Sequence, residues 1–387
     1  MRRSFYSDVH DSYRDTVRSF VARHVTPSLA KWDQARLIDR EVWTSAAAAG
    51  LIGLAAPEEF GGAGETDFRF RSVVMEELAG VGAHSLQNTF SLQDDVVLPY
   101  FLDLADEDQR RRWLPGLAGG TLIGAIAMTE PDTGSDVLGI KTTAKRTSNG
   151  WVINGQKTFI SSGISADIVI VVARTDLQGG ARGLSLFVVE RDMPGFQRGR
   201  KLDKVGLHAQ DTAELFFDSV EVPGANLLGE EGRGFFHLLE RLPRERLSIA
   251  ASAVASSVAI LKVTADYCFQ RKAFGSRIGD FQHSRFKLAE IETEVDVTQA
   301  YVDKAVLALN DGTLLAVDAA KAKWWATEVH KTVVDRCVQL HGGYGFMLEY
   351  AVARAFIDSR IETIYGGTTE IMKEVIGRDI AKRYGSG

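Results

Sequence analysis

The chain has 387 residues, 45% of them hydrophobic and 25% charged, which is typical of a globular protein with two or three domains and a sizeable core. Its net charge of −6 and its pI near 5.8 argue against a nucleic acid or an anionic membrane as a partner. Cys268 and Cys337 are too few for a disulfide framework, and both are expected to be buried as small apolar residues.

The first third of the chain has a helical pattern. From about Asp8, apolar residues recur every three or four positions, as in Val17, Phe20 and Val21. Glycine-rich turns at 57–64 and 115–120 separate and close these helices. We therefore predict a helical domain over residues 1–120.

After this region the pattern changes to short apolar and β-branched runs, which are typical of strands. These runs lie at 123–128, 151–153, 168–172, 184–189 and 213–222. Asn149-Gly150 predicts a hairpin between residues 141–146 and the run that begins at Trp151, because both turn residues tolerate a positive φ. Pro223-Gly224 and the glycine-rich link after it close a β domain that we predict over residues 121–232.

Helical periodicity resumes near Phe235 and continues to the end of the chain, as in Leu238, Leu239 and Leu242. Residues 233–387 are therefore predicted to form a helical bundle. The order of helices, strands and helices favours three segregated domains over alternating βαβ units.

The N-terminus contains no apolar run behind Arg2 and Arg3, so it does not resemble a signal peptide. No stretch is expected to reach the roughly 18 apolar residues that span a bilayer. Both observations predict a soluble, cytoplasmic protein without a membrane span.

Several common active-site motifs are absent from the sequence. No Gly-x-Gly-x-x-Gly fingerprint lies between a strand and a helix, and no Gly-x-x-x-x-Gly-Lys-Ser/Thr or Gly-x-Ser-x-Gly pattern occurs. The eight histidines show no His-x-x-x-His spacing, so no metal site is predicted.

Five separated motifs together resemble the acyl-CoA dehydrogenase family, in the family's order and over nearly the whole chain. They lie at 127–136, 154–161, 271–275, 339–345 and 364–370. The resemblance implies an α+β fold with an N-terminal helical domain, a middle barrel-like or orthogonal β domain and a C-terminal four-helix bundle. It also implies FAD as cofactor and the oxidation of an acyl-CoA to the trans-2-enoyl-CoA.

The position of the catalytic base sets this chain apart within that family. The loop that carries the catalytic glutamate in most members has Gly366 at that position, which has no side chain to accept a proton. A minority branch, with long-chain and isovaleryl-type enzymes, places its glutamate on the neighbouring helix, in a context similar to residues 242–247. Glu245 is therefore the candidate base, with a pKa expected to rise toward neutrality, although Arg-Glu-Arg in an arbitrary helix would be a solvated charge cluster. Gly366 would keep a role through its backbone N–H, as a donor to the thioester carbonyl.

Matching motif positions imply a set of cofactor-binding residues. They are Met128, Thr129, Gly134, Ser135, Phe159, Ile160, Ser161, Arg271, Phe274, Gln282, Gln339, Gly342, Gly343, Thr368 and Glu370. Phe159 stands where many members have a tryptophan packed on the flavin. Without the resemblance, residues 128–135 would be interpreted as a β-turn after a strand. Arg271 would be a solvated charge on a helix, and residues 339–343 would be a turn that ends a helix.

The resemblance also implies substrate contacts and an assembly. The substrate residues would be Ser135, Arg246, Tyr365, Gly366 and Gly367. In the family, the positions of Arg271, Gln282 and 339–343 contact the FAD of a neighbouring subunit, so a homotetramer built as a dimer of dimers is expected.

The substrate and the electron acceptor stay open at this point. A long or medium straight-chain acyl-CoA is the first expectation, and a branched short-chain, isovaleryl-type substrate is the alternative. Gln93, Asp94 and Asp95 could form a polar pocket floor or a helix surface. An electron-transfer flavoprotein is the expected acceptor, whereas a flavin oxidase or monooxygenase, or a non-catalytic subunit, would be a different class of protein on the same fold.

Overall fold

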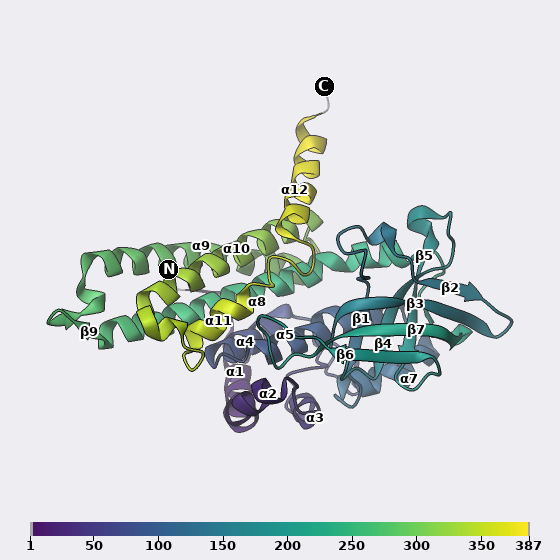
Figure 1. Ribbon diagram of the computed structural model, residues 1–387, viewed down its shortest axis with the longest axis horizontal. Coiled ribbons are helices and arrows are strands. Elements are labelled where there is room, and N and C mark those ends of the chain that lie inside the picture. Colours follow the sequence, from purple (N-terminus) through teal and green to yellow (C-terminus); the bar gives the residue numbers. More distant parts are fainter. Residues whose placement is uncertain (1–2, 386–387) are drawn as a thin grey trace.

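The computed structural model describes residues 3–385, whose elements follow the predicted order of helices, strands and helices (Figure 1). The first group contains α1 (Asp8–Phe20), α2 (Leu29–Ala35), α3 (Glu41–Ala48), α4 (Phe68–Gly80), α5 (His84–Ser91), α6 (Leu98–Leu104) and α7 (Glu107–Ala118). Two π-helical segments, η1 (Val21–Val25) and η4 (Leu92–Val97), continue α1 and α5. The expected α+β fold class is confirmed.

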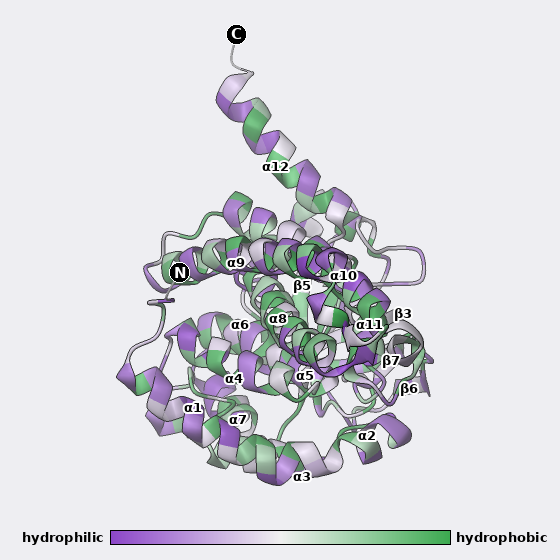
Figure 2. Ribbon diagram, turned by 90° about the vertical axis from the view of Figure 1, so that its left-hand side faces the viewer, coloured by the Kyte–Doolittle hydropathy of each residue, from purple (hydrophilic) through white to green (hydrophobic). Residues whose placement is uncertain are grey.

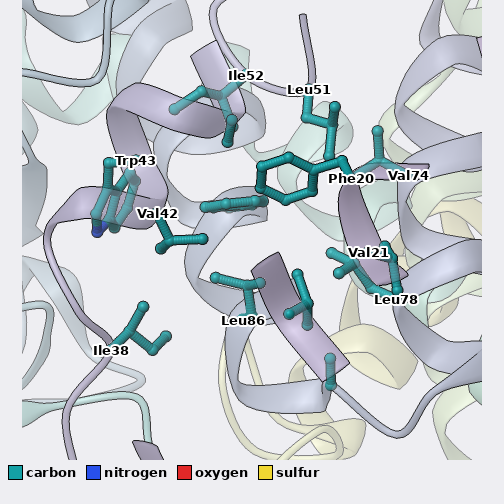
Figure 3. Close-up of a cluster of buried hydrophobic side chains, with 14 of the residues drawn as sticks. Phe20, Val21, Ile38, Val42, Trp43, Leu51, Ile52, Val74, Leu78 and Leu86 are labelled. Atoms are coloured by element: carbon teal, nitrogen blue, oxygen red, sulfur yellow. The ribbon is translucent and has the colours of Figure 1, made fainter. Parts of the chain in front are cut away.

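The helices of the first group enclose a common apolar core. Figure 3 shows Phe20, Trp43, Leu51, Val74 and Leu86 of this core, which come from α1, α3, α4, α5 and the segment after α3. The apolar positions spaced by three and four residues are thus the buried ones, as the sequence pattern predicted.

The strands form one sheet in the order β6-β7-β3-β2-β4-β5-β8, with β1 parallel to β4. Their bounds are β1 (Gly124–Ala127), β2 (Thr143–Arg146), β3 (Gly150–Ser161), β4 (Ile168–Arg174), β5 (Leu184–Glu190), β6 (Phe196–Lys201), β7 (Thr212–Pro223) and β8 (Leu227–Leu228). Strands β4 and β5 are buried on both faces, which explains their continuous apolar runs. The sequence pattern missed β6, because only Phe196 of this polar edge strand is buried.

The predicted hairpin is confirmed, but its turn differs from the expected one. β2 and β3 pair antiparallel with Arg146 opposite Trp151. Gly150 has a φ of +149°, whereas Asn149 does not have a positive φ. A Cβ at Gly150 would lie 2.2 Å from the carbonyl oxygen of Val222, so the glycine also permits the close approach of β7.

The last group contains α8 (Gly234–Gln270), α9 (Gln282–Asn310), α10 (Ala316–His341), α11 (Ala351–Ser359) and α12 (Thr369–Tyr384). A small hairpin, β9 (Lys272–Ala273) and β10 (Ser276–Arg277), joins α8 to α9. Helices α8, α9 and α10 pack along one another, whereas α12 extends away from the body of the molecule (Figures 1 and 2). Cys268 and Cys337 are unpaired and buried, as expected.

Helix α8 corrects the expectation that no stretch is apolar enough to cross a membrane. An 18-residue window of α8 has a mean hydropathy of 1.7, and by length and composition it passes that test. However, 67% of this window is buried inside the fold, where α8 packs against α4, α9 and α10. The apolar composition of α8 is thus accounted for by a core position.

Candidate active site

Glu245 lies on α8 with only 6% of its surface exposed, and the adjacent Arg246 is also buried. The solvated charge cluster considered for this Arg-Glu-Arg segment is therefore wrong. Burial raises the pKa of Glu245 to about 7, against the opposing effects of a hydrogen bond from Tyr100 and the charges of Arg246 and Arg241. A carboxyl group with this pKa suits a general base that works near neutral pH.

The loop at Gly366 packs directly against α8, close to Glu245. Arg246 Nε donates to the carbonyl oxygen of Gly366 at 3.3 Å. A Cβ at position 366 would lie 2.5 Å from Ile249 Cδ1, and the φ of +66° is one that favours glycine. Within residues 3–385, the N–H of Gly366 has no acceptor, so it is free to bind a ligand oxygen.

Two further polar contacts from different elements hold this loop, and a third supports one of them. Lys323 of α10 donates to the carbonyl oxygen of Gly367 at 2.7 Å, and Asn88 of α5 donates to the hydroxyl oxygen of Tyr365 at 2.9 Å. Gln210, which precedes β7, donates to Asn88 Oδ1 at 2.8 Å. The sequence analysis missed Lys323, Asn88 and Gln210. Only Lys323 carried a signal, as a lysine between Ala322 and Trp324; its side chain is fully buried in the structure.

A buried ion pair joins the loop after β1 to strand β3. Lys157 Nζ donates to the Met128 carbonyl oxygen and to Glu130 Oε1, both at 2.9 Å. The Thr158 N–H also donates to the Thr129 carbonyl oxygen at 2.9 Å. Two of the predicted cofactor segments therefore lie side by side, and Lys157 and Glu130, which the sequence analysis did not single out, hold them together.

Phe159 is 69% exposed and has a φ of +57°, at a register shift between β3 and β7. A left-handed backbone costs a non-glycine residue about 1–2 kcal/mol. An exposed aromatic ring held in a strained conformation is typical of a ligand-binding position. Ser161 is half-buried, whereas the Ile160 side chain packs in the core of the sheet and leaves only its backbone for a ligand.

The second set of predicted cofactor residues lies at the other end of α8. Arg271, Gln339, Gly342 and Gly343 line a hollow of about 520 Å³ together with Tyr344. The guanidinium carbon of Arg271 lies 5.6 Å from the centre of the Tyr344 ring. At a helical rise of about 1.5 Å per residue, these residues lie roughly 40 Å from Glu245 along α8 (Figure 1).

The β9–β10 hairpin beside this hollow exposes an aromatic ring. Phe274 is 97% exposed and has a φ of +51°, and Gly275 follows with a φ of +81°. Both central residues of this two-residue turn therefore adopt left-handed conformations, as a type I′ turn requires. Gln282, also exposed, begins α9 just beyond the hairpin.

Three sequence models that describe the N-terminal, middle and C-terminal domains of acyl-CoA dehydrogenase match residues 7–121, 125–220 and 232–381 of this chain. The chain belongs to the acyl-CoA dehydrogenase family. This family consists of FAD-dependent oxidoreductases that act on acyl-CoA.

Two curated relatives cover almost the whole chain. Long-chain specific acyl-CoA dehydrogenase, mitochondrial, from Sus scrofa is 45% identical over 380 residues, which are 98% of this chain and 88% of the relative. Isovaleryl-CoA dehydrogenase, mitochondrial, from Oryza sativa subsp. japonica is 33% identical over 379 residues, which are 97% of this chain and 92% of the relative.

Solved structures share the fold. Acyl-CoA dehydrogenase from Geobacillus kaustophilus superposes with a TM-score of 0.95 at 43% identity, covering 97% of this chain and 99% of that chain. A chain in the structure described as "Electron transferring flavoprotein of Acidaminococcus fermentans: Towards a mechanism of flavin-based electron bifurcation" has a TM-score of 0.92 at 33% identity, covering 97% and 98%.

The residues present fit the FAD that acyl-CoA dehydrogenases use. Phe159 offers an exposed ring face, and Arg271 offers a cation at a hollow. Gly134 and Ser135 are exposed, and a Cβ at Gly134 would meet no protein atom within 4 Å, so a ligand could approach the backbone there. In the part of the chain that the structure describes, no three His, Cys, Asp or Glu side chains are grouped to hold a metal ion.

Glu370 and Thr368 lie at the start of α12. Thr368 is the N-cap residue, and its side chain accepts a hydrogen bond from the Ile371 N–H at 3.4 Å. Glu370 is exposed, and its own backbone N–H lowers its pKa from the usual value. Glu370 is thus a solvated, ionised carboxylate, which does not suit an acyl-CoA dehydrogenase base.

Gln93, Asp94 and Asp95 form neither an exposed helix surface nor an open pocket floor. All three are buried in η4. Asp95 accepts hydrogen bonds from Arg71 Nε at 3.0 Å and from Ser248 Oγ at 2.7 Å, so it links α4 to α8, three residues after Glu245. Asp95 thus braces the helix that carries the candidate base, whereas Asp94 accepts from the Gly53 N–H and Gln93 donates to the carbonyl oxygens of two residues at the end of α7 and beyond it.

Proposed function

We propose that this chain oxidises a long or medium straight-chain acyl-CoA to the trans-2-enoyl-CoA, with Glu245 as the base. The observation that carries the proposal is a buried carboxyl group with a pKa of about 7 on α8, beside a loop whose glycine has a free N–H. The identity to the long-chain relative, 45%, against 33% for the isovaleryl relative, supports the straight-chain substrate. A branched short-chain acyl-CoA is the alternative.

In this mechanism Glu245 removes the α-proton of the thioester. The Gly366 N–H donates to the thioester carbonyl oxygen and stabilises the negative charge that develops there, which is worth about 3 kcal/mol for one such donor. Bound FAD would supply the acceptor for the β-hydride. Arg246 and Lys323 fix the loop by donating to the carbonyl groups of Gly366 and Gly367.

The proposed FAD contacts are the two sets of residues described above. Phe159, Ser161 and the loop at 128–135, which includes the proposed substrate residue Ser135, would hold the flavin end. Arg271 and its neighbours lie roughly 40 Å away along α8, too far to reach the same cofactor molecule. We therefore propose that a second copy of the chain completes each site, within a homotetramer.

An electron-transfer flavoprotein is the proposed electron acceptor, which the similarity to a chain of the Acidaminococcus fermentans structure supports. A flavin oxidase or monooxygenase is less well supported, because most hydroxylations need no acceptor for an α-proton. A non-catalytic subunit would not need Glu245 buried at this pKa.

Two further sequence predictions stay proposals. The division into domains at 1–120, 121–232 and 233–387 is supported by the matches at 7–121, 125–220 and 232–381. The cytoplasmic location is a prediction from the sequence, whereas the Sus scrofa and Oryza sativa relatives are named mitochondrial.

The decisive experiment is anaerobic mixing of the FAD-loaded protein with acyl-CoAs from isovaleryl-CoA to palmitoyl-CoA, with the visible flavin absorbance as readout. We expect fast bleaching by the straight chains and a loss of at least about 100-fold in the bleaching rate of Glu245→Gln. Glu374→Gln is the matched control, because that carboxylate is exposed on α12 and pairs with Arg378, and it should bleach like the wild type. Fast bleaching of Glu245→Gln would reject the base, and bleaching by isovaleryl-CoA alone would reject the straight-chain substrate.

A further inference from the structure

Tyr100 is the one side chain in residues 3–385 that donates a hydrogen bond to Glu245. It lies on α6, is 0% exposed, and its hydroxyl group is 3.1 Å from Glu245 Oε1. The two residues are 145 positions apart in the sequence and belong to different domains of the fold. The contact therefore forms only when α6 packs against the part of α8 that carries the base.

We propose that Tyr100 is a positioning residue for the base: its hydroxyl group holds Oε1 of Glu245 and leaves Oε2 to take the α-proton of the substrate. This proposal rests on the proposed function, because it requires Glu245 to be the base. A carboxylate has two equivalent oxygens and a freely rotating end group, so a fixed donor at one oxygen orients the other.

The surroundings of Tyr100 keep its hydroxyl group protonated, so that it acts as the donor to Glu245. Burial and the nearby Glu245 raise the pKa of Tyr100 well above its usual value, so the phenol stays protonated throughout the working pH range. The guanidinium carbon of Arg241 lies 5.1 Å from the centre of the Tyr100 ring, and Arg241 pairs with Asp103 at 3.1 Å. The Arg241 cation contacts the face of the ring, and this contact does not involve the hydroxyl group.

The hydrogen bond also changes the pH at which the base ionises. A donor to the carboxylate favours the charged form, against the burial that disfavours it. The other charges that act on Glu245 are Arg241 and Arg246 of α8 itself, and the facing loop presents the uncharged Gly366 and Gly367. Loss of the Tyr100 hydroxyl group should therefore leave Glu245 protonated to a higher pH.

Tyr100→Phe tests the role of the hydroxyl group, because it keeps the ring and its packing and removes only that group. A hydrogen bond to a charged acceptor corresponds to a shift of about one pH unit or more, so we expect the acid limb of kcat/KM to move up by about one unit. At pH 7 kcat/KM should fall at least about five-fold, since the ionised fraction drops from about a half to about a tenth. At pH 9, where the base is ionised in both proteins, a smaller loss should remain because the carboxylate is no longer oriented. We expect the loss in kcat, with KM for palmitoyl-CoA unchanged.

Tyr6→Phe is the matched control. The Tyr6 hydroxyl group also donates to a glutamate, Glu76 Oε1 at 2.8 Å, but on a contact between the N-terminal segment and α4. Its pH profile should equal that of the wild type. An unchanged acid limb in folded, FAD-loaded Tyr100→Phe would overturn the positioning role, whereas full activity of Glu245→Gln would overturn the base itself, so the two failures are distinguishable.

A second measurement keeps the proposal testable if Tyr100→Phe does not fold. Wild-type protein that carries 3-fluorotyrosine has more acidic phenols, which donate stronger hydrogen bonds, so its acid limb should move to lower pH. The same labelling of Tyr6→Phe should give the same shift. An acid limb that does not move in either labelled protein would overturn the proposal.

Discussion

At the scale of single residues, the proposed chemistry depends on one carboxyl group that the fold keeps away from water. Glu245 is surrounded by protein, and burial raises its pKa from the usual 4.5 to about 7. The same burial destabilises the folded protein once the group ionises, because the unfolded chain releases this proton at a lower pH than the folded chain. Activity and stability are thus opposed at this residue.

The first prediction follows from that opposition. Between the pKa of the unfolded chain and about pH 7, the folded state binds more protons, so the contribution of Glu245 to stability falls as pH rises. The stability advantage of Glu245→Gln should therefore grow by roughly 2 kcal/mol between pH 5 and pH 8. Thermal unfolding at fixed protein and FAD concentrations would measure it. A constant Tm difference between the two proteins across this range would contradict the raised pKa.

Gly366 is the second residue on which the site depends. Gly366→Ala should lower both Tm and kcat, because its φ of +66° disfavours a side chain and the new Cβ would displace Ile249. The cost of the conformation alone is about 1 kcal/mol. Gly377→Ala on α12 is the control, since a Cβ there meets nothing within 4 Å, and it should not lower Tm. Equal effects of the two substitutions would show that position 366 does not need glycine.

At the scale of elements, Lys157 and Glu130 hold together β3 and the loop after β1, which carry the proposed flavin contacts. Burial lowers the pKa of Lys157 to about 8. Burial also acts to raise the pKa of Glu130, but the charge of Lys157 and several hydrogen bonds outweigh it and keep that pKa below the usual value. The pair is therefore ionised at neutral pH, and each member depends on the other.

Lys157→Met should accordingly destabilise the protein by about 3 kcal/mol, because it leaves the Glu130 carboxylate buried without its cation. The flavin content after purification should fall as well, since the loop at 128–135 loses its anchor. Lys141→Met is the matched control in the same segment. Lys141 pairs with Asp132 at the exposed surface, so its loss should change neither Tm nor flavin content. A similar loss in both variants would argue against the anchor.

At the scale of the whole molecule, the two sets of proposed cofactor residues lie toward opposite ends of α8 (Figure 1). One chain cannot bring both proposed sets to one FAD, so the proposed site would combine the base of one chain with Arg271 of another. The exposed Phe274 and the projecting α12 with its exposed Ile380 and Tyr384 are consistent with contacts to further copies (Figure 2).

Co-expression of two inactive variants tests this arrangement. Glu245→Gln lacks the base, and Arg271→Ala lacks the distant cofactor contact. A dimer with one copy of each should regain one working site, which combines the intact Glu245 of one chain with the intact Arg271 of the other. Activity of the co-purified hybrid, compared with each variant alone, is the measurement. Absence of any recovery would indicate that each site is built within one chain.

Many of the helices and strands could be predicted from the sequence, for identifiable physical reasons. Periodicity of three and four residues marked the buried face of α1, and continuous apolar runs marked the doubly buried β4 and β5. The edge strand β6 was not predicted, because only one of its residues is buried and its sequence therefore has no apolar pattern. It is a strand because it pairs with β7. Helix α8 was not recognised as a long apolar element, because its core face is built largely of alanine and serine.

The sequence by itself determined which residues are available for the chemistry: a glutamate on the helix, a glycine in the loop and aromatic rings at Phe159 and Phe274. Only the tertiary structure decided their environment. Burial sets the pKa of Glu245, and the contacts of Tyr100, Lys323 and Asn88 join segments far apart in the chain. A local pattern reports the identity and spacing of side chains, whereas desolvation and hydrogen bonding between distant segments arise only when the domains pack together.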